Sequence, residues 1–186
     1  MRIIAGKYRS RIIKMPEGAA GIRPTKDRLR EALFNIISGS IPGAAALDAF
    51  AGSGAFGIEA LSRGAKKIVF IDKEKRCVRT IKDNLKMLDI SNGNTAVWKM
   101  DAFKAFVMLE RKKEKFDVIF LDPPYYKDMA KKSLIILNRH DILKPNCIII
   151  AEHYKKDILP GGLHNITSYR TACYGDIFLT FYKAKR

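Results

Sequence analysis

Cysteine is scarce in this chain and long hydrophobic runs are absent. The three cysteines, Cys77, Cys147 and Cys173, are odd in number, lie far apart and form no C-x-x-C pair. They indicate neither a disulfide framework nor a zinc site. No apolar run approaches the ~20 residues of a membrane span, and the charges interleaved in residues 1–14 do not suit a signal peptide. We therefore expect a cytoplasmic protein without a metal site or a membrane partner.

Acidic residues are also few. The chain has 19 Asp and Glu against 35 Lys and Arg, which leaves a formal net charge of +16 at pH 7. This excess is atypical of a protein that handles only small neutral metabolites and indicates a polyanionic partner. A length of 186 residues, of which 47% are hydrophobic, is enough for one domain with its own core.

From residue 44 onward, short apolar runs alternate with longer amphipathic segments. The predicted strands are Ala45–Phe50, Lys67–Ile71, Thr95–Lys99, Phe116–Leu121 and Cys147–Ala151. The predicted helices are Phe56–Ser62, Lys75–Leu88, Phe103–Arg111 and Lys131–Leu137. This alternation predicts an α/β fold, a parallel sheet with helices on both faces. Ile166–Ala172 and Ile177–Lys183, joined by a tight turn, predict an antiparallel pair that closes the sheet.

The chain begins with a short basic extension, residues 1–22, ahead of the main domain, residues 23–186. Residues 1–14 alternate apolar and basic side chains around Gly6, which predicts a hairpin or an extended arm. A helix with one buried face is expected between Thr25, a possible N-cap, and Gly39. Clustered basic side chains are typical of phosphate binding. The candidates are Arg9, Arg11, Lys14, Arg23, Arg28 and Arg30.

A glycine-rich turn follows the first predicted strand. The pattern G-x-G-x-x-G occurs at Gly52, Gly54 and Gly57, between that strand and the next helix. Glycines let the backbone turn tightly and approach a ligand closely. A tight turn that binds no ligand would show the same pattern, so the glycines alone do not define a site.

Acidic residues end the first three predicted strands of this sheet or lie just past them. Asp72, 20 residues after Gly52, can accept hydrogen bonds from both hydroxyls of a ribose. Asp101, with Phe103 nearby, can accept from an adenine amine or can serve as a helix N-cap. Asp48 would repel a pyrophosphate and attract an ammonium group. Asp72 and Asp101 suit either cofactor, and it is Asp48 that favours S-adenosylmethionine over a nicotinamide dinucleotide as the ligand.

The fourth predicted strand leads into Asp122-Pro123-Pro124-Tyr125. The two prolines stiffen the chain and present a carboxylate, a carbonyl and an aromatic ring at the ligand-binding edge of the sheet. The Asp122 carboxylate and the Pro123 carbonyl could hold an exocyclic amine, while Tyr125 stacks on the base. This segment predicts methyl transfer to a base nitrogen. Glu152, after the fifth strand, is interpreted as part of a polar strand end.

The segments DAFAGSGAFGIEALSRGA, FIDKEK, MDAF and DVIFLDPPY resemble the class I S-adenosylmethionine-dependent amino-methyltransferases. The segments MRIIAGKYRSRII, RPTKDRLREALFNII and YGDIFLTFYK resemble, more narrowly, the RsmD family of small-subunit ribosomal RNA guanine-N2 methyltransferases. The resemblance covers nearly the whole chain. It implies a Rossmann-like, seven-stranded, mostly parallel sheet with an antiparallel last strand, S-adenosylmethionine as donor, and one guanine of 16S RNA as target.

The same resemblance implies roles for individual residues. The implied cofactor-binding residues are Asp48, Phe50, Gly52, Gly54, Asp72, Asp101 and Ala102, and the implied catalytic residues are Asp122, Pro123, Pro124 and Tyr125. We expect a monomer that acts on ribosomal RNA in an assembling subunit. Three alternatives stay open: a DNA or RNA adenine-N6 methyltransferase, a nicotinamide-dependent oxidoreductase, and a non-catalytic RNA-binding module.

Overall fold

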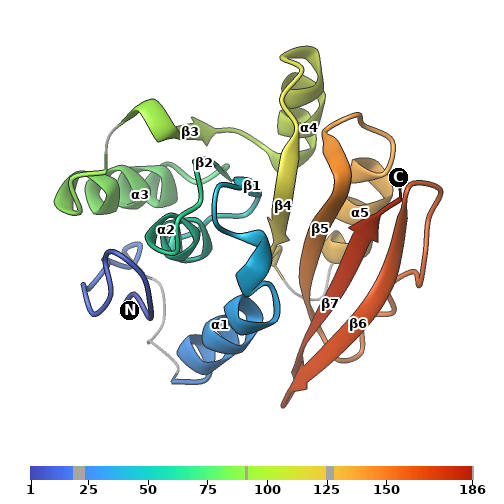
Figure 1. Ribbon diagram of the computed structural model, residues 1–186, viewed down its shortest axis with the longest axis horizontal. Helices are drawn as coiled ribbons and strands as arrows, with labels where there is room; N and C mark the ends of the chain where they lie inside the picture. The colour runs from blue at the N-terminus through green and yellow to red at the C-terminus, as the bar shows by residue number, and fades with distance from the viewer. Residues whose placement is uncertain (19–23, 91, 125–127, 186) are drawn as a thin grey trace.

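The computed structural model describes residues 1–18, 24–90, 92–124 and 128–185 (Figure 1). Two predicted site residues, Arg23 and Tyr125, lie outside these ranges. The strands are β1 (Ala45–Asp48), β2 (Lys67–Asp72), β3 (Thr95–Lys99), β4 (Phe116–Leu121), β5 (Leu143–Tyr154), β6 (Ile166–Tyr174) and β7 (Ile177–Ala184). The helices are α1 (Pro24–Ile36), α2 (Ala55–Ser62), α3 (Lys75–Met87), α4 (Ala102–Arg111) and α5 (Met129–Leu137), with short 3-10 helices at Ser38–Ser40 and Asn92–Asn94.

The seven strands form one sheet in the order β3-β2-β1-β4-β5-β7-β6. Strands β1 to β5 pair in parallel, and β7 runs antiparallel to both of its neighbours, β5 and β6. The prediction of a Rossmann-like, mostly parallel sheet with an antiparallel last strand is confirmed. Chain order reverses between β1 and β4, the place where open α/β sheets bind ligands.

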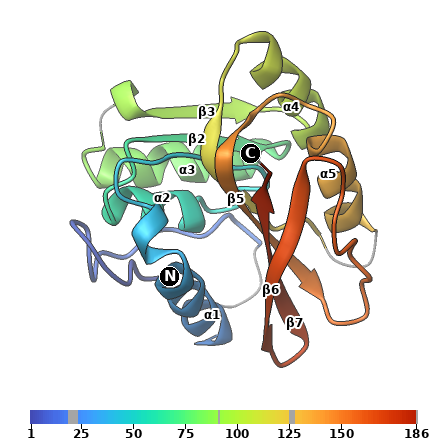
Figure 2. The same ribbon diagram turned by 45° about the vertical axis from the view of Figure 1, so that its right-hand side comes forward.

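Helices cover both faces of the sheet (Figures 1 and 2). One hydrophobic cluster contains buried residues of α1, α2 and α3, and a second cluster contains those of α4 and α5. Successive residues of a central strand enter different clusters, as Phe120 and Leu121 of β4 do. Because both faces are buried, these strands are continuously apolar rather than alternating, which is why they stand out in the sequence.

The N-terminal arm packs on this domain. Met1, Ile3 and Ile13 are buried in the same cluster as α1 and α2. The Glu59 carboxylate of α2 accepts hydrogen bonds from the backbone N–H groups of Ile4 and Ala5, at 2.8 and 3.0 Å. The arm therefore adds to the core, while its basic side chains and Ile12 remain exposed.

Strand β5 is longer at both ends than the predicted Cys147–Ala151. Its first residue, Leu143, pairs with Phe116 before a register shift, and its last residues pair with β7 as far as Tyr154. Local hydrophobicity did not reveal this extension because it depends on the partner strands. Among the described residues, no helix is both long enough and apolar enough to cross a membrane.

Candidate active site

A cavity of about 450 Å³ lies at the carboxyl ends of β1 to β4, beside the place where the strand order reverses. It brings together residues that the sequence separates by more than 70 positions. The predicted site residues that line it are Phe50, Gly52, Asp72, Asp101, Ala102, Asp122, Pro123 and Pro124. Polar groups converging on a largely apolar pocket are typical of a ligand site.

The three glycines of the loop between β1 and α2 serve different purposes. Gly52 has φ +54°, and a Cβ added there would meet no atom within 4 Å, so there is open space in front of the loop. Gly54 has φ +81° and precedes the first residue of α2. A Cβ on Gly57 would lie 2.2 Å from a ring carbon of Phe70. The first two glycines therefore shape the turn, and the third lets the helix approach the sheet closely.

The Asp72 carboxylate is held in place by two backbone groups. One oxygen accepts from the N–H of Gly52 and the other from the N–H of Glu74, both at 2.8 Å. A carboxylate offers about four lone-pair sites, so each oxygen keeps capacity for a further donor. The side chain borders the cavity in a fixed orientation and could accept hydrogen bonds from two hydroxyls of a ligand.

Asp101 is the N-cap of α4. Its carboxylate accepts from the backbone N–H groups of Phe103 and Lys104, at 3.0 and 3.2 Å. Asp101 therefore has the N-cap role that the sequence also allowed, because a side-chain oxygen at this position satisfies N–H groups of the first helical turn. Asp101 also lines the cavity, together with the buried Ala102.

Asp48 lies buried beneath the glycine loop, with 1% of its surface exposed. Its carboxyl accepts from the N–H of Gly57 at 3.1 Å. The pKa of Asp48 is raised to about 7, mainly by burial; the bond from Gly57 acts to lower it and the nearby negative charge of Asp72 acts to raise it. Asp48 is thus hydrogen-bonded to the first turn of α2. Its expected contact with an ammonium group stays a prediction.

The segment after β4 forms the opposite wall of the cavity. Pro123 is buried, Pro124 is exposed and Asp122 is half-buried. Asp122 also lines a second, smaller cavity of about 240 Å³ between the N-terminal arm, α1 and the glycine loop. Glu152, interpreted from the sequence as part of a polar strand end rather than as a pocket residue, lines this smaller cavity. Its position directly after a predicted strand is the same signal that identified Asp72.

Four of the predicted phosphate-binding residues are exposed: Arg9, Arg11, Lys14 and Arg28. Arg30 differs from these four, because only 2% of its surface is exposed. Its guanidinium forms ion pairs with Asp27 at 3.2 Å and with Glu59 at 3.7 Å. A buried arginine is stable only with such partners, and its charge is not available to a phosphate.

The three cysteines are free thiols. Cys77 is partly buried and lines both cavities, Cys147 is buried, and Cys173 is exposed. Burial raises the pKa of the Cys77 thiol to about 11. Over the described ranges of the chain, no three His, Cys, Asp or Glu side chains gather in a way that could hold a metal ion.

A Rossmann-like sheet with one antiparallel strand, a glycine loop at its switch point and acids at the carboxyl ends of β2, β3 and β4 define an S-adenosylmethionine-dependent methyltransferase. The family follows from comparison with known proteins. The family model described as "Conserved hypothetical protein 95" matches residues 1–183, and the chain belongs to this family.

Two relatives carry the name ribosomal RNA small subunit methyltransferase D. The protein of Haemophilus influenzae is 40% identical over 156 residues, which cover 83% of this chain and 79% of the relative. The Escherichia coli protein is 32% identical over 183 residues, covering 98% and 89%. The solved structure of E. coli yhhF has a TM-score of 0.83 at 29% identity and covers 100% of this chain and 98% of that one. The resemblance to the RsmD family is confirmed.

Proposed function

We propose that this protein transfers a methyl group from S-adenosylmethionine to the exocyclic N2 amine of a guanine in small-subunit ribosomal RNA. One observation carries the proposal: Asp122 and Pro123 line the same cavity as Asp72 and Asp101. Asp72 and Asp101, which suit an adenosine, and Asp122 and Pro123, which suit a base amine, thus line one cavity. Names of relatives that specify small-subunit ribosomal RNA support the choice of substrate.

The cavity suits the adenosine part of the cofactor. Asp72 is positioned to accept from the ribose hydroxyls, and Asp101 from the adenine amine, because both are carboxylates at its wall. Open space in front of Gly52 leaves room for the ligand against the backbone of the loop. Phe50 and Gly52 border the cavity, while Asp48 and Gly54 support the loop from behind.

S-adenosylmethionine supplies, when bound, an electrophilic methyl group on a positively charged sulfur. The exocyclic amine of guanine is a poor nucleophile because its lone pair is delocalised into the ring. Hydrogen bonds from the amine to the Asp122 carboxylate and the Pro123 carbonyl hold it at the cavity and favour a localised lone pair. The rigid Pro123-Pro124 unit limits the motion of these acceptors, so their geometry is set before the base arrives. Tyr125 is the proposed stacking partner of the base.

The exposed basic residues suit an RNA partner. Arg9, Arg11 and Lys14 lie on the arm, and Arg28 lies on α1, all with exposed side chains. Together with the net charge of +16, they offer a surface for the phosphate backbone. Arg23 remains a proposed member of this surface. We further propose that the enzyme acts as a monomer on RNA within an assembling subunit.

The test is methyl transfer from labelled S-adenosylmethionine to small-subunit particles that lack the modification, followed by nucleoside analysis. The expected product is N2-methylguanosine. N6-methyladenosine would show that the protein is an adenine methyltransferase instead. No incorporation into either the particles or the free RNA would contradict the proposal.

A further inference from the structure

Asp122 and Glu152 stand side by side at the carboxyl ends of two adjacent parallel strands. In the register of β4 and β5, Leu121 pairs with Ala151, so the next residues along are Asp122, directly after β4, and Glu152, within β5. Neighbouring strands lie about 4.8 Å apart, and side chains at paired positions point to the same face of a sheet. The register therefore places the two acids at neighbouring positions, and both line the smaller cavity.

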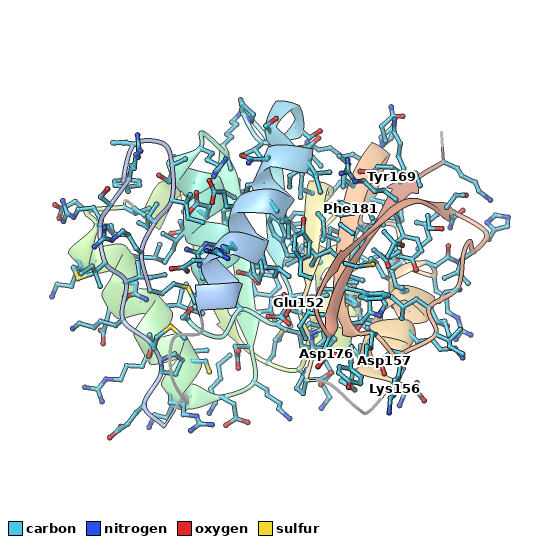
Figure 3. The ribbon with its side chains drawn as sticks, turned by 90° about the horizontal axis from the view of Figure 1, so that it is seen from below. Glu152, Lys156, Asp157, Tyr169, Asp176 and Phe181 are labelled. Atoms are coloured by element: carbon cyan, nitrogen blue, oxygen red, sulfur yellow. The ribbon has the colours of Figure 1, made fainter. Side chains whose placement is uncertain are left out.

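This pair faces the α1 side of the sheet. Leu121 and Ala151 belong to the cluster beneath α4 and α5. Because side chains alternate along a strand, the residues after them point the other way. Figure 3 shows Glu152 close to α1, and the smaller cavity is lined both by Glu152 and by Leu29 of that helix.

The smaller cavity has both charged and apolar lining. Its charged residues are Asp122, Glu152, Arg30 and Arg76, and Phe56 of α2 is one of its apolar residues. Asp122, with Phe50, Gly52 and Cys77, also lines the larger cavity, so the two spaces meet at Asp122. A base whose amine is held at Asp122 can thus extend into the smaller cavity, toward Glu152.

We propose that Glu152 selects guanine by accepting a hydrogen bond from its N1–H while Asp122 holds the adjacent N2 amine. This inference rests on the proposed function. Guanine presents N1–H and N2–H as neighbouring donors, whereas adenine presents its amine beside an N1 lone pair, which a carboxylate repels. A carboxylate has about four lone-pair sites, so Glu152 can accept this bond and keep other partners.

Burial makes the selection strong. Glu152 has 4% of its surface exposed and lines the smaller cavity, so a base that fills this cavity displaces the water that could otherwise supply a missing donor. A buried acceptor that faces a lone pair instead of an N–H loses the bond and gains a repulsion. An exposed carboxylate would discriminate weakly between guanine and adenine, because water would donate hydrogen bonds to it in either case.

Replacement of guanine by 2-aminopurine tests this role with the unmodified protein. 2-Aminopurine keeps the amine at C2, lacks O6 and carries a lone pair at N1 in place of N1–H. The methylated guanosine is first located with labelled cofactor and then replaced by 2-aminopurine riboside in otherwise identical small-subunit RNA. We expect kcat/KM for the guanosine substrate to exceed that for the analogue by about 100-fold or more. Equal values would overturn the role of Glu152.

The variant Glu152→Gln separates Glu152 from the rest of the site. Its amide can donate to the N1 lone pair of 2-aminopurine, and the shape of the side chain is kept. We expect kcat/KM on guanosine to fall roughly 10- to 100-fold and the preference for guanosine to shrink at least tenfold. The control Glu114→Gln, on an acid paired with Lys67, should keep the wild-type preference.

Cofactor binding distinguishes the remaining outcomes. Calorimetry with S-adenosylhomocysteine should give the Glu152→Gln variant a Kd within about threefold of wild type, because Glu152 does not line the larger cavity. A tenfold weaker Kd with an unchanged base preference would assign Glu152 to the cofactor and overturn the inference. An unchanged preference with normal guanosine methylation would also overturn it and leave the proposed function intact. Failure of the wild-type protein to methylate guanosine would overturn both.

Discussion

The Asp72 carboxylate accepts a hydrogen bond from the backbone N–H of Gly52 at 2.8 Å. This bond joins the end of β2 to the loop after β1, two segments that are neighbours only because their strands pair. The acid proposed to bind the ribose and the glycine proposed to border the cofactor are therefore parts of one unit. Changing either residue disturbs the position of the other.

Replacement of Asp72 should weaken cofactor binding. Asp72→Ala removes the proposed ribose acceptor and the anchor of the Gly52 loop, and each hydrogen bond to a charged acceptor contributes about 1.5–3 kcal/mol. We expect at least a tenfold higher Kd for S-adenosylmethionine, measured by calorimetry. Asp83→Ala, an exposed position on α3, is the control. An unchanged Kd, or wild-type protein that prefers NADH, would rule out this site assignment.

Replacement of Asp122 should act on turnover rather than on the cofactor. Asp122→Ala removes the acceptor that holds the amine, and loss of this positioning should lower kcat by about 10²-fold. The Kd for S-adenosylmethionine should stay within a few-fold of wild type. Asp141→Ala, at an exposed acid paired with Lys115, provides a matched control for single-turnover assays. Near-normal methyl transfer by the Asp122 variant would remove Asp122 from the mechanism.

The exposed basic residues of the arm should determine RNA affinity and its salt dependence. Each phosphate contact contributes roughly 0.7–0.9 to the slope of log affinity against log salt concentration. Replacing Arg9, Arg11 and Lys14 with Ser should flatten the slope by about 2 while leaving cofactor binding unchanged. The control replaces the exposed Arg111-Lys112-Lys113 run with Ser. If both triple variants show the wild-type slope, the arm does not contact the phosphates.

Gly57→Ala should destabilise the fold. The added methyl would lie 2.2 Å from a ring carbon of Phe70, so α2 or the ring must move. Overpacking of this kind costs typically about 1–3 kcal/mol, which urea unfolding can measure. Gly39→Ala is the control, since a Cβ there meets nothing within 4 Å. Equal stability of the two variants would mean that the helix adjusts without cost.

The buried Asp48 should make stability depend on pH. Its pKa is about 7 in the folded protein against an ordinary value of 3.8. Between these values the folded protein keeps a proton that the unfolded chain releases. The free energy of unfolding should therefore fall as pH rises from 4 to 7, by an amount on the order of a few kcal/mol, and level off above 7.

Asp48→Asn isolates this contribution, because the amide oxygen can still accept from Gly57 and does not titrate. Urea unfolding at a series of pH values from 4.5 to 8 should show a smaller decline for the variant than for the wild type. Parallel curves would show that Asp48 is ionised in the folded protein throughout this range.

Local sequence was sufficient to predict the sheet, the glycine loop and the acids at the strand ends. The central strands are apolar throughout because they are buried on both faces, and this signal survives in a single sequence. Asp72, Asp101 and Asp122 could be placed at one edge because the carboxyl ends of parallel strands meet there. The sequence therefore determined the class of fold and the chemistry of the larger cavity.

Tertiary structure decided which charged groups are available. Arg30 lies in a basic stretch of the sequence, yet it is buried and forms an ion pair with Glu59, 29 residues later. Glu152 lies near the end of β5 and Asp122 directly after β4, and only the β4–β5 register makes the two acids neighbours. Burial and pairing depend on residues distant in the chain, and the free energy of a buried charge depends on those partners. Local pattern identifies a charged side chain, whereas the packed fold determines whether it contacts solvent, ligand or another charge.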